Sequence, residues 1–267
     1  MDTIPSGATG HELDFSLIQR YMSERAVGNA RVYVQSVVTS TNDVVREYVH
    51  DLAHVDCVAV AADEQTSGRG RLDRNWESMH GLGIALSIAI TAERIAGPLT
   101  SIPLRTGLAA VRALEVCGLE ADLKWPNDIV LSGGVRGLRK LGGILVQRFP
   151  ECIVMGIGIN VAHSQEQLPI PEATSASLEG HIIEHELLIA HLMDEVRRVM
   201  LHDSDWLDDY RDRCVTIGTK VTVQRLSQND ITGMVSLVND QGHLVLDVDG
   251  ECVAIDTGDV QHVRVTD

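Results

Sequence analysis

The chain has 267 residues and a formal net charge of −16 at pH 7. That length predicts one large domain with a small one attached, because three ordinary domains would not fit. The acidic charge argues against nonspecific binding to nucleic acid, since such binding relies on Lys and Arg displacing counterions from phosphates. With 44% hydrophobic but only 3% aromatic residues, we expect a globular core of aliphatic side chains.

The cysteines and the N-terminus predict a cytoplasmic protein. The five cysteines are scattered and never spaced as CxxC, a pattern that favours reduced thiols over disulfides or a zinc knuckle. The first residues lack a basic flank and an apolar run, so no signal peptide is expected. The longest nearly apolar stretch, residues 81–90, has about half of the roughly 20 residues that a bilayer requires. We therefore predict a buried strand there and no membrane segment.

The first half of the chain alternates expected strands and helices. Residues 1–30 are polar apart from a helix-like run near 14–24, and a strand is expected at 32–37. Ser40-Thr41-Asn42 is typical of a helix start, and the helix should continue to about residue 53. The remaining elements expected here are a strand at 57–62, a long loop at 66–80, a strand at 81–90 and a helix at 99–117 ending at Gly118.

The second half predicts an antiparallel region followed by a small β-domain. Strand-like runs at 121–131, 141–149 and 152–159 are separated by links too short for parallel crossovers, so a simple doubly wound sheet is excluded. Helices are expected at 182–200 and 206–213. After Cys214, five short alternating runs separated by turns predict a small all-β barrel, with the domain boundary near residue 215.

The segment Gly68–Trp76 reads GRGRLDRNW and is the strongest chemical signal. Charge runs are often solvated turns. Here, however, glycines allow close backbone approach, arginines supply planar donors for carboxylate or phosphate, and a tryptophan can stack on a base. The chain contains neither GxxxxGK[ST] nor a complete GxGxxG. The segment therefore predicts an anion-binding loop of another type.

Two further motifs, Lys124–Asp128 (KWPND) and Lys140–Leu145 (KLGGIL), lie in the expected antiparallel region. A lysine within an apolar strand is commonly an exposed edge residue. Paired glycines beside Lys140 instead favour a ligand lying against the strand. We expect Lys140 to be unpaired and to face that ligand.

In this order, the motifs resemble the biotin–protein ligase family over residues 31–265, as a form without an N-terminal DNA-binding domain. The resemblance implies an α+β fold in which a mixed, largely antiparallel sheet like that of class II aminoacyl-tRNA synthetases precedes an SH3-like barrel. It implies an N-terminal extension at 1–30, a catalytic domain at 31–214 and a barrel at 215–267. The motifs that carry it are Ser40-Thr41-Asn42, Gln65, Gly68–Trp76, Lys124–Asp128, Lys140–Val146 and Gly156–Asn160.

The resemblance implies an ATP-dependent ligase. Such an enzyme converts biotin to biotinyl-5′-AMP, transfers biotin to a lysine of a biotin carboxyl carrier protein or domain, and releases pyrophosphate and AMP. Mg²⁺ would accompany ATP, held mainly by phosphate oxygens and water. Neither DNA nor a membrane is an expected partner, and the sequence leaves the oligomeric state and the acceptor protein open.

The resemblance also implies site residues. Three cations are implied in catalysis, because joining a carboxylate to an anionic phosphate requires fixed positive charge; they are Lys140, Arg69 and Arg71. The residues implied for biotin are Ser40, Thr41, Asn42, Gln65, Gly68, Arg69, Gly70, Arg71, Lys140 and Gly143. Those implied for ATP are Arg71, Arg74, Trp76, Lys124, Asn127, Asp128 and Asn160, with no protein metal site.

The sequence also leaves other functions open. A lipoate–protein ligase or octanoyl transferase shares the fold and the acyl transfer to lysine, and a non-catalytic biotin-responsive regulator belongs to another class. The barrel could serve partner binding. The run His181-Ile-Ile-Glu-His185 matches the HxxEH zinc motif. We expect instead the ordinary surface face of a helix there, because matches of this length arise by chance.

Overall fold

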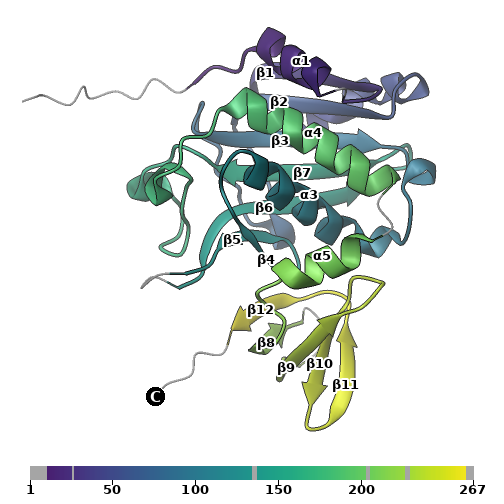
Figure 1. Cartoon of the computed structure of the whole chain (residues 1–267), viewed down its shortest axis with the longest axis vertical. Coiled ribbons are helices and arrows are strands. Elements are labelled where there is room, and N and C mark those ends of the chain that lie inside the picture. The colour runs from purple at the N-terminus through teal and green to yellow at the C-terminus, as the bar shows by residue number, and fades with distance from the viewer. Residues whose placement is uncertain (1–10, 26, 134–136, 203–204, 226–228, 263–267) are drawn as a thin grey trace, which may run out of the picture.

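The computed structural model describes residues 11–25, 27–133, 137–202, 205–225 and 229–262 (Figure 1). Its main feature is a seven-stranded sheet of order β1-β2-β3-β7-β6-β5-β4. Strands β1 and β2 run parallel, and the other neighbouring pairs run antiparallel. The strand bounds are β1 Ala30–Val38, β2 Cys57–Gln65, β3 Gly83–Ile90, β4 Asp122–Lys124, β5 Asp128–Leu131, β6 Arg139–Arg148 and β7 Ile153–Asn160.

Long helices cover one face of this sheet (Figure 1). On β7, Ile153, Met155, Ile157 and Ile159 belong to the same buried apolar cluster as these helices. Successive side chains of a strand point to opposite faces, so the intervening β7 residues face the other side. The helices are α1 Phe15–Glu24, α3 Ile102–Val116, α4 His185–Leu201 and α5 Trp206–Arg213.

The opposite face is covered differently. There α2 (Thr41–Val44) and a 3₁₀ helix at Val45–Ala53 pack on the β1–β3 side. Val45 and Leu52 of this segment join a small apolar cluster with Val58 and Val60 of β2. The rest of this face, over β6 and β7, is left for the loop at 66–80 and for a cavity.

The C-terminal part forms a separate antiparallel sheet of order β11-β10-β9-β8-β12. Alternating Val221, Val223, Val235, Leu244 and Leu246 are buried inside it. Its strands are β8 Lys220–Gln224, β9 Ile231–Val238, β10 Leu244–Val248, β11 Glu251–Ile255 and β12 Asp259–His262. The mixed sheet and this second sheet confirm the predicted fold class, while part of the last predicted run, 263–265, lies outside the described residues.

Two predicted elements need correction. The run 121–131 is not one strand but the hairpin of β4 and β5, whose turn contains a cis peptide bond between Trp125 and Pro126. The helix predicted up to residue 53 is a four-residue α-helix followed by 3₁₀ helix. Ser40 stands at its N-cap as expected but makes no side-chain cap hydrogen bond. Among the described residues no helix is long and apolar enough to cross a membrane.

Trp125 joins the two sheets. Its side chain is 1% exposed, and its indole N–H donates to the carbonyl of Gly242, in the turn between β9 and β10, at 3.0 Å. The backbone N–H of Trp125 donates to Thr216 Oγ1 at 3.1 Å. The β4–β5 turn is therefore held against the C-terminal sheet by one buried side chain.

We predict that Trp125→Phe destabilises the protein by about 2 kcal/mol, because the Gly242 carbonyl loses its donor and a small cavity forms. Urea denaturation followed by circular dichroism measures this change. Trp206→Phe, at another buried indole, controls for loss of ring volume. An unchanged unfolding midpoint for Trp125→Phe would contradict this account of the contact.

Candidate active site

A cavity of about 520 Å³ lies between the open face of the main sheet, the loop at 66–80 and the C-terminal sheet. All residues predicted for the site line it except Gly68. The structure thus brings together residues that are far apart in the sequence. Their individual roles stay predictions. The lining members are Ser40, Thr41, Asn42, Gln65, Arg69, Gly70, Arg71, Arg74, Trp76, Lys124, Asn127, Asp128, Lys140, Gly143 and Asn160.

Glycines of β6 and β7 form the floor of the cavity. A Cβ atom on Gly158 would lie 2.4 Å from the Trp76 ring, and one on Gly143 would lie 3.5 Å from that ring. On Gly156 it would lie 2.3 Å from Asn42 Oδ1. The indole and the amide can therefore lie on the sheet only because Gly158 and Gly156 carry no side chain, whereas a Cβ atom on Gly143 would make an ordinary contact.

One end of the cavity is neutral and rich in hydrogen-bonding groups. Ser40, Thr41 and Asn42, at the start of α2, are each less than 5% exposed. Gln65, at the end of β2, accepts from the backbone N–H of Thr41 at 2.8 Å and lies 3.0 Å from its hydroxyl. This end can hold a small polar ring.

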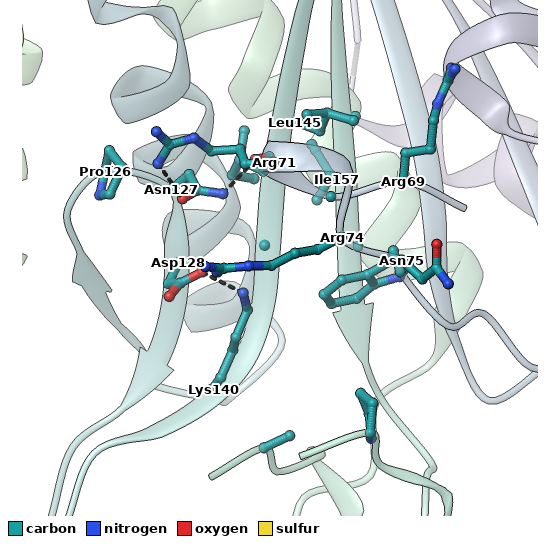
Figure 2. Close-up of a pocket in the computed structure, with 18 of the residues that line it drawn as sticks. Arg69, Arg71, Arg74, Asn75, Pro126, Asn127, Asp128, Lys140, Leu145 and Ile157 are labelled. Carbon is teal, nitrogen blue, oxygen red and sulfur yellow. Dashed lines mark hydrogen bonds and ion pairs between the residues drawn. The ribbon is translucent and has the colours of Figure 1, made fainter. Parts of the chain in front are cut away.

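The other end carries paired charges (Figure 2). Lys140 Nζ lies 2.5 Å from Asp128 Oδ1, so the expectation of an unpaired Lys140 is wrong. The pairing arises because β5 and β6 are neighbours, with Val130 opposite Lys140 beside a shift in register. Lys140 is 31% exposed at its side chain and remains accessible to an anion from the cavity.

Arg71 and Arg69 point in different directions (Figure 2). Arg71 donates to Asn127 Oδ1 at 3.2 Å, next to the charged end, and burial lowers its pKa. Arg69 instead pairs with Asp43 of α2 at 2.6 Å. The structure therefore places Arg71 at the charged end of the cavity with Lys140. Arg69 is directed away from that end, toward Asp43.

The C-terminal sheet contributes to the cavity, which sequence reasoning missed. Gln224, Asp259, Val260 and Gln261 line it. Arg74 forms an ion pair with Asp259, and Arg71 donates to Thr257 Oγ1 at 3.3 Å. In the sequence Thr257-Gly258-Asp259 reads as an ordinary turn, and nothing in it marks a contact with a loop almost two hundred residues earlier.

The loop Gln165–Glu179 closes the side next to β6. Lys140 N–H donates to the Glu172 carbonyl at 2.7 Å, and Thr174 N–H donates to the Lys140 carbonyl at 2.8 Å. Asn160, at the end of β7, donates from Nδ2 to the Thr174 carbonyl at 3.0 Å. Sequence reasoning missed this loop as well, although Pro169, Ile170 and Ala173 line the cavity.

The HxxEH run forms the expected surface face only in part: Ile182 and Glu184 are exposed, whereas Ile183 and His185 are buried. Helix α4 begins at His185, which is 7% exposed and stacks on His11 with ring centroids 5.1 Å apart. Burial lowers the pKa of His185 to about 4. Within the described ranges no three His, Cys, Asp or Glu side chains are grouped to hold a metal ion.

Comparisons with known proteins all find ligases of the same kind. The model of the biotin/lipoate A/B protein ligase family matches residues 34–160. A biotin–[acetyl-CoA-carboxylase] ligase of Mycobacterium tuberculosis is 33% identical over 79% of this chain and 81% of its own length. A bifunctional ligase/repressor of Escherichia coli is 30% identical over 82% of this chain and 70% of its own.

Solved structures agree on the fold. The biotin protein ligase of Aquifex aeolicus in complex with biotin and ATP has a TM-score of 0.71 at 23% identity, covering 88% of this chain and 99% of that one. The biotin protein ligase of Leishmania major in complex with biotinyl-5-AMP has a TM-score of 0.57 at 25% identity, covering 89% and 99%. The described architecture therefore recurs over nearly the whole length of both.

The contact between Arg74 and Asp259 predicts that the C-terminal sheet holds the loop at 66–80. We expect Asp259→Ala to accelerate amide hydrogen exchange in residues 70–76 while lowering stability by less than about 1 kcal/mol, since the pair is partly exposed. Asp256→Ala removes an exposed carboxylate from the connection between β11 and β12 and is the control. Equal exchange in both variants would show that Asp259 does not restrain the loop.

Proposed function

The chain belongs to the biotin–protein ligase family, and we propose that it joins biotin to ATP as biotinyl-5′-AMP and then transfers biotin to a lysine of a carrier protein. The observation that carries the proposal is the division of the cavity. A neutral, hydrogen-bonding end at Thr41 and Gln65 is separated by a glycine floor from a cationic end at Lys140. Biotin has the same division, with a ureido ring at one end and a carboxylate at the other.

The neutral end also favours biotin over lipoate or octanoate. Those acids end in a dithiolane or an alkyl group, which cannot pair with the buried groups of Ser40, Thr41 and Asn42. Burying a polar group without a partner costs about 1–3 kcal/mol. A site built around such groups therefore discriminates against ligands that lack hydrogen-bonding atoms.

In the proposed first step, a biotin carboxylate oxygen attacks the α-phosphorus of ATP, and pyrophosphate leaves with the electrons of the broken P–O bond. Lys140 and Arg71 would offset the repulsion between the two anions and stabilise the negative charge of the transition state. Trp76, flat against Gly143 and Gly158, offers its exposed side to the adenine base.

Mg²⁺ is proposed to accompany ATP. The carboxylates that line the cavity are Glu77, Asp128 and Asp259, and within the described ranges no three acidic or imidazole groups form a cage. This donor set fits Mg²⁺ held mainly by phosphate oxygens and water. When bound there, the ion would neutralise charge on the departing pyrophosphate.

In the proposed second step, the neutral amine of the acceptor lysine attacks the biotinyl carbonyl carbon. The bond from that carbon to the phosphate oxygen breaks, AMP leaves with its electrons, and the attacking nitrogen gives up one proton to water. The mixed anhydride is sensitive to water. The loop at 66–80 covers the cavity through contacts of Arg71 and Arg74, so it would retain the intermediate until a carrier arrives.

We propose a catalytic domain at 31–214 and a barrel domain at 215–267, each with its own sheet. The carrier would be a biotin carboxyl carrier protein or domain of a carboxylase, as the M. tuberculosis relative's name indicates for that protein. The charge of −16 supports an enzyme that does not bind DNA. The five scattered cysteines, never spaced as CxxC, support a cytoplasmic location.

The proposed function predicts covalent modification of one lysine. We expect the purified chain, incubated with ATP, Mg²⁺, biotin and a carrier domain, to add the mass of one biotinyl group to one carrier lysine. Intact-mass spectrometry measures this. Replacing biotin by lipoate or octanoate should give no comparable transfer, and preferential transfer of either acid would assign the chain to the alternative acyl ligases.

The charged end predicts a role for Lys140 in adenylation. We expect Lys140→Ala to slow biotinyl-adenylate formation by about 10²-fold, equivalent to roughly 3 kcal/mol, through loss of one transition-state cation. Single-turnover kinetics measure it. Stability should fall by about 1 kcal/mol, because Asp128 loses its partner but stays 22% exposed. Lys220→Ala, in the C-terminal sheet, is the control, and activity within a few fold of it would remove Lys140 from the reaction.

A further inference from the structure

The chain carries few amines that its own intermediate could modify. Only three of its 22 basic residues are lysines, and two of them, Lys124 and Lys140, line the cavity. The third, Lys220, is exposed at the start of β8. The mixed anhydride of the proposed first step reacts with any neutral amine that reaches its carbonyl carbon. A lysine beside the reacting groups is therefore itself a possible acceptor.

The Lys140 amine lies above the floor of the cavity. A Cβ atom on Gly143 would be 3.6 Å from Lys140 Nζ and 3.5 Å from Cζ3 of Trp76. The amine and the indole ring therefore meet above the same glycine. In the proposed reaction Lys140 contacts both the carboxylate and the α-phosphate, so its nitrogen would stay close to the carbonyl carbon of the intermediate.

The carboxylate of Asp128 holds this nitrogen (Figure 2). Asp128 begins β5, which lies between β4 and β6 in the main sheet. Its Oδ1 atom is 2.5 Å from Lys140 Nζ. An adjacent opposite charge favours the charged form of an amine. In that form the nitrogen lone pair is bonded to a proton, so Lys140 cannot attack a carbonyl carbon.

The other cation at this end acts in the opposite sense. Arg71 donates to Asn127, the residue before Asp128. Burial lowers the pKa of Arg71, while the carboxylates of Asp259 and Asp128 raise it. A positive charge near an amine favours the neutral form of that amine, and a guanidinium keeps its proton. Of Arg71 and Lys140, only Lys140 can therefore become a nucleophile, and Asp128 opposes this change.

The carboxylate of Asp128 matters most after the first step. Before that step, the biotin carboxylate and the triphosphate both bring negative charge to Lys140. Their joining removes the charge of the carboxylate and releases pyrophosphate. The acyl group is therefore electrophilic at the stage when the substrates supply the least negative charge to Lys140. The Asp128 carboxylate is present throughout.

We propose that Asp128 is a positioning residue that keeps Lys140 as an ammonium ion and so protects the enzyme from acylation by its own intermediate. This inference rests on the proposed function. Without the carboxylate, the neutral Lys140 amine attacks the biotinyl carbonyl carbon, and the bond from that carbon to the phosphate oxygen breaks. AMP leaves with its electrons, and the nitrogen gives up one proton to water. The resulting amide removes the cation that adenylation requires.

Self-acylation is measured on the whole chain, supplied with prepared biotinyl-5′-AMP and no carrier. Peptide mass spectrometry gives the initial rate of biotin addition at Lys140 relative to Lys220 in the same sample. We expect Asp128→Asn to raise this ratio about tenfold, because loss of an adjacent opposite charge increases the neutral fraction of an amine by a factor of this order. An unchanged ratio in a variant that still binds biotinyl-5′-AMP overturns the proposal.

Two matched variants separate the carboxylate of Asp128 from a general loosening of the site. Asp128→Glu keeps a carboxylate and should hold the ratio at the parent value. Asp43→Asn removes the carboxylate paired with Arg69 and should also leave the ratio unchanged. A rise in either variant as large as that in Asp128→Asn would show that the charge beside Lys140 is not the cause, and the proposal would fail.

A second measurement applies if Asp128→Asn does not bind the intermediate. Acetic anhydride acylates amines without any affinity for the site. The ratio of acetylation at Lys140 to that at Lys220 should again rise about tenfold over the parent, and an unchanged ratio overturns the proposal. Asp128→Ala takes the place of the amide variant if that variant does not fold. If the parent chain neither forms nor binds biotinyl-5′-AMP, the proposed function fails instead, whatever the acetylation shows.

Discussion

The site depends on one steric constraint, the absence of a side chain at Gly156 and Gly158 on the cavity face of β7. Glycine at 156 and 158 leaves space that the Trp76 ring and the Asn42 amide occupy, and a Cβ atom on Gly156 or Gly158 would lie 2.3–2.4 Å from them. The opposite face of β7 carries large aliphatic residues that pack on the helices. Side chains alternate along a strand. The aliphatic residues of β7 therefore pack in the core, while its glycines on the other face leave room for the cavity.

Several cationic side chains that line the cavity form ion pairs with carboxylates. The protein is strongly acidic, and three of the cations at the site are paired with a carboxylate: Arg69 with Asp43, Arg74 with Asp259 and Lys140 with Asp128. These partners keep the cations from repelling one another before substrates bind. An incoming carboxylate or phosphate competes with them, so part of its attraction is offset by the lost pair.

Much of the fold follows from local sequence patterns. Apolar alternation located the strands of the C-terminal sheet closely, and the 3.6-residue period located α3, α4 and α5. The antiparallel arrangement followed from short links at Pro150-Glu151. The hairpin at Trp125-Pro126 was missed because its apolar residues read as one continuous strand. The 3₁₀ helix at 45–53 was missed because its sequence period does not distinguish it from an α-helix.

The candidate site was predictable where a motif carried its chemistry and hidden where contacts are long-range. Gly68–Trp76 and Lys140 were found from glycine and charge, but the Asp128 partner of Lys140 depends on strand register, which the sequence does not specify. Asp259 reads as part of a turn in the sequence. His185 was assigned to the surface because α4 has polar residues at its start, whereas the segment at 11–14 covers it.

The C-terminal sheet is coupled to the site from two sides. On one side, Thr257 and Asp259 hold the arginines of the loop over the cavity. On the other, Trp125 and the Leu123 carbonyl, which accepts from Val215 at 2.9 Å, hold the β4–β5 turn that carries Asn127 and Asp128. Both the cover and the charged end of the cavity therefore rest on the same small sheet. A shift of that sheet would move Arg71, which donates to Thr257 Oγ1, relative to Lys140 on β6.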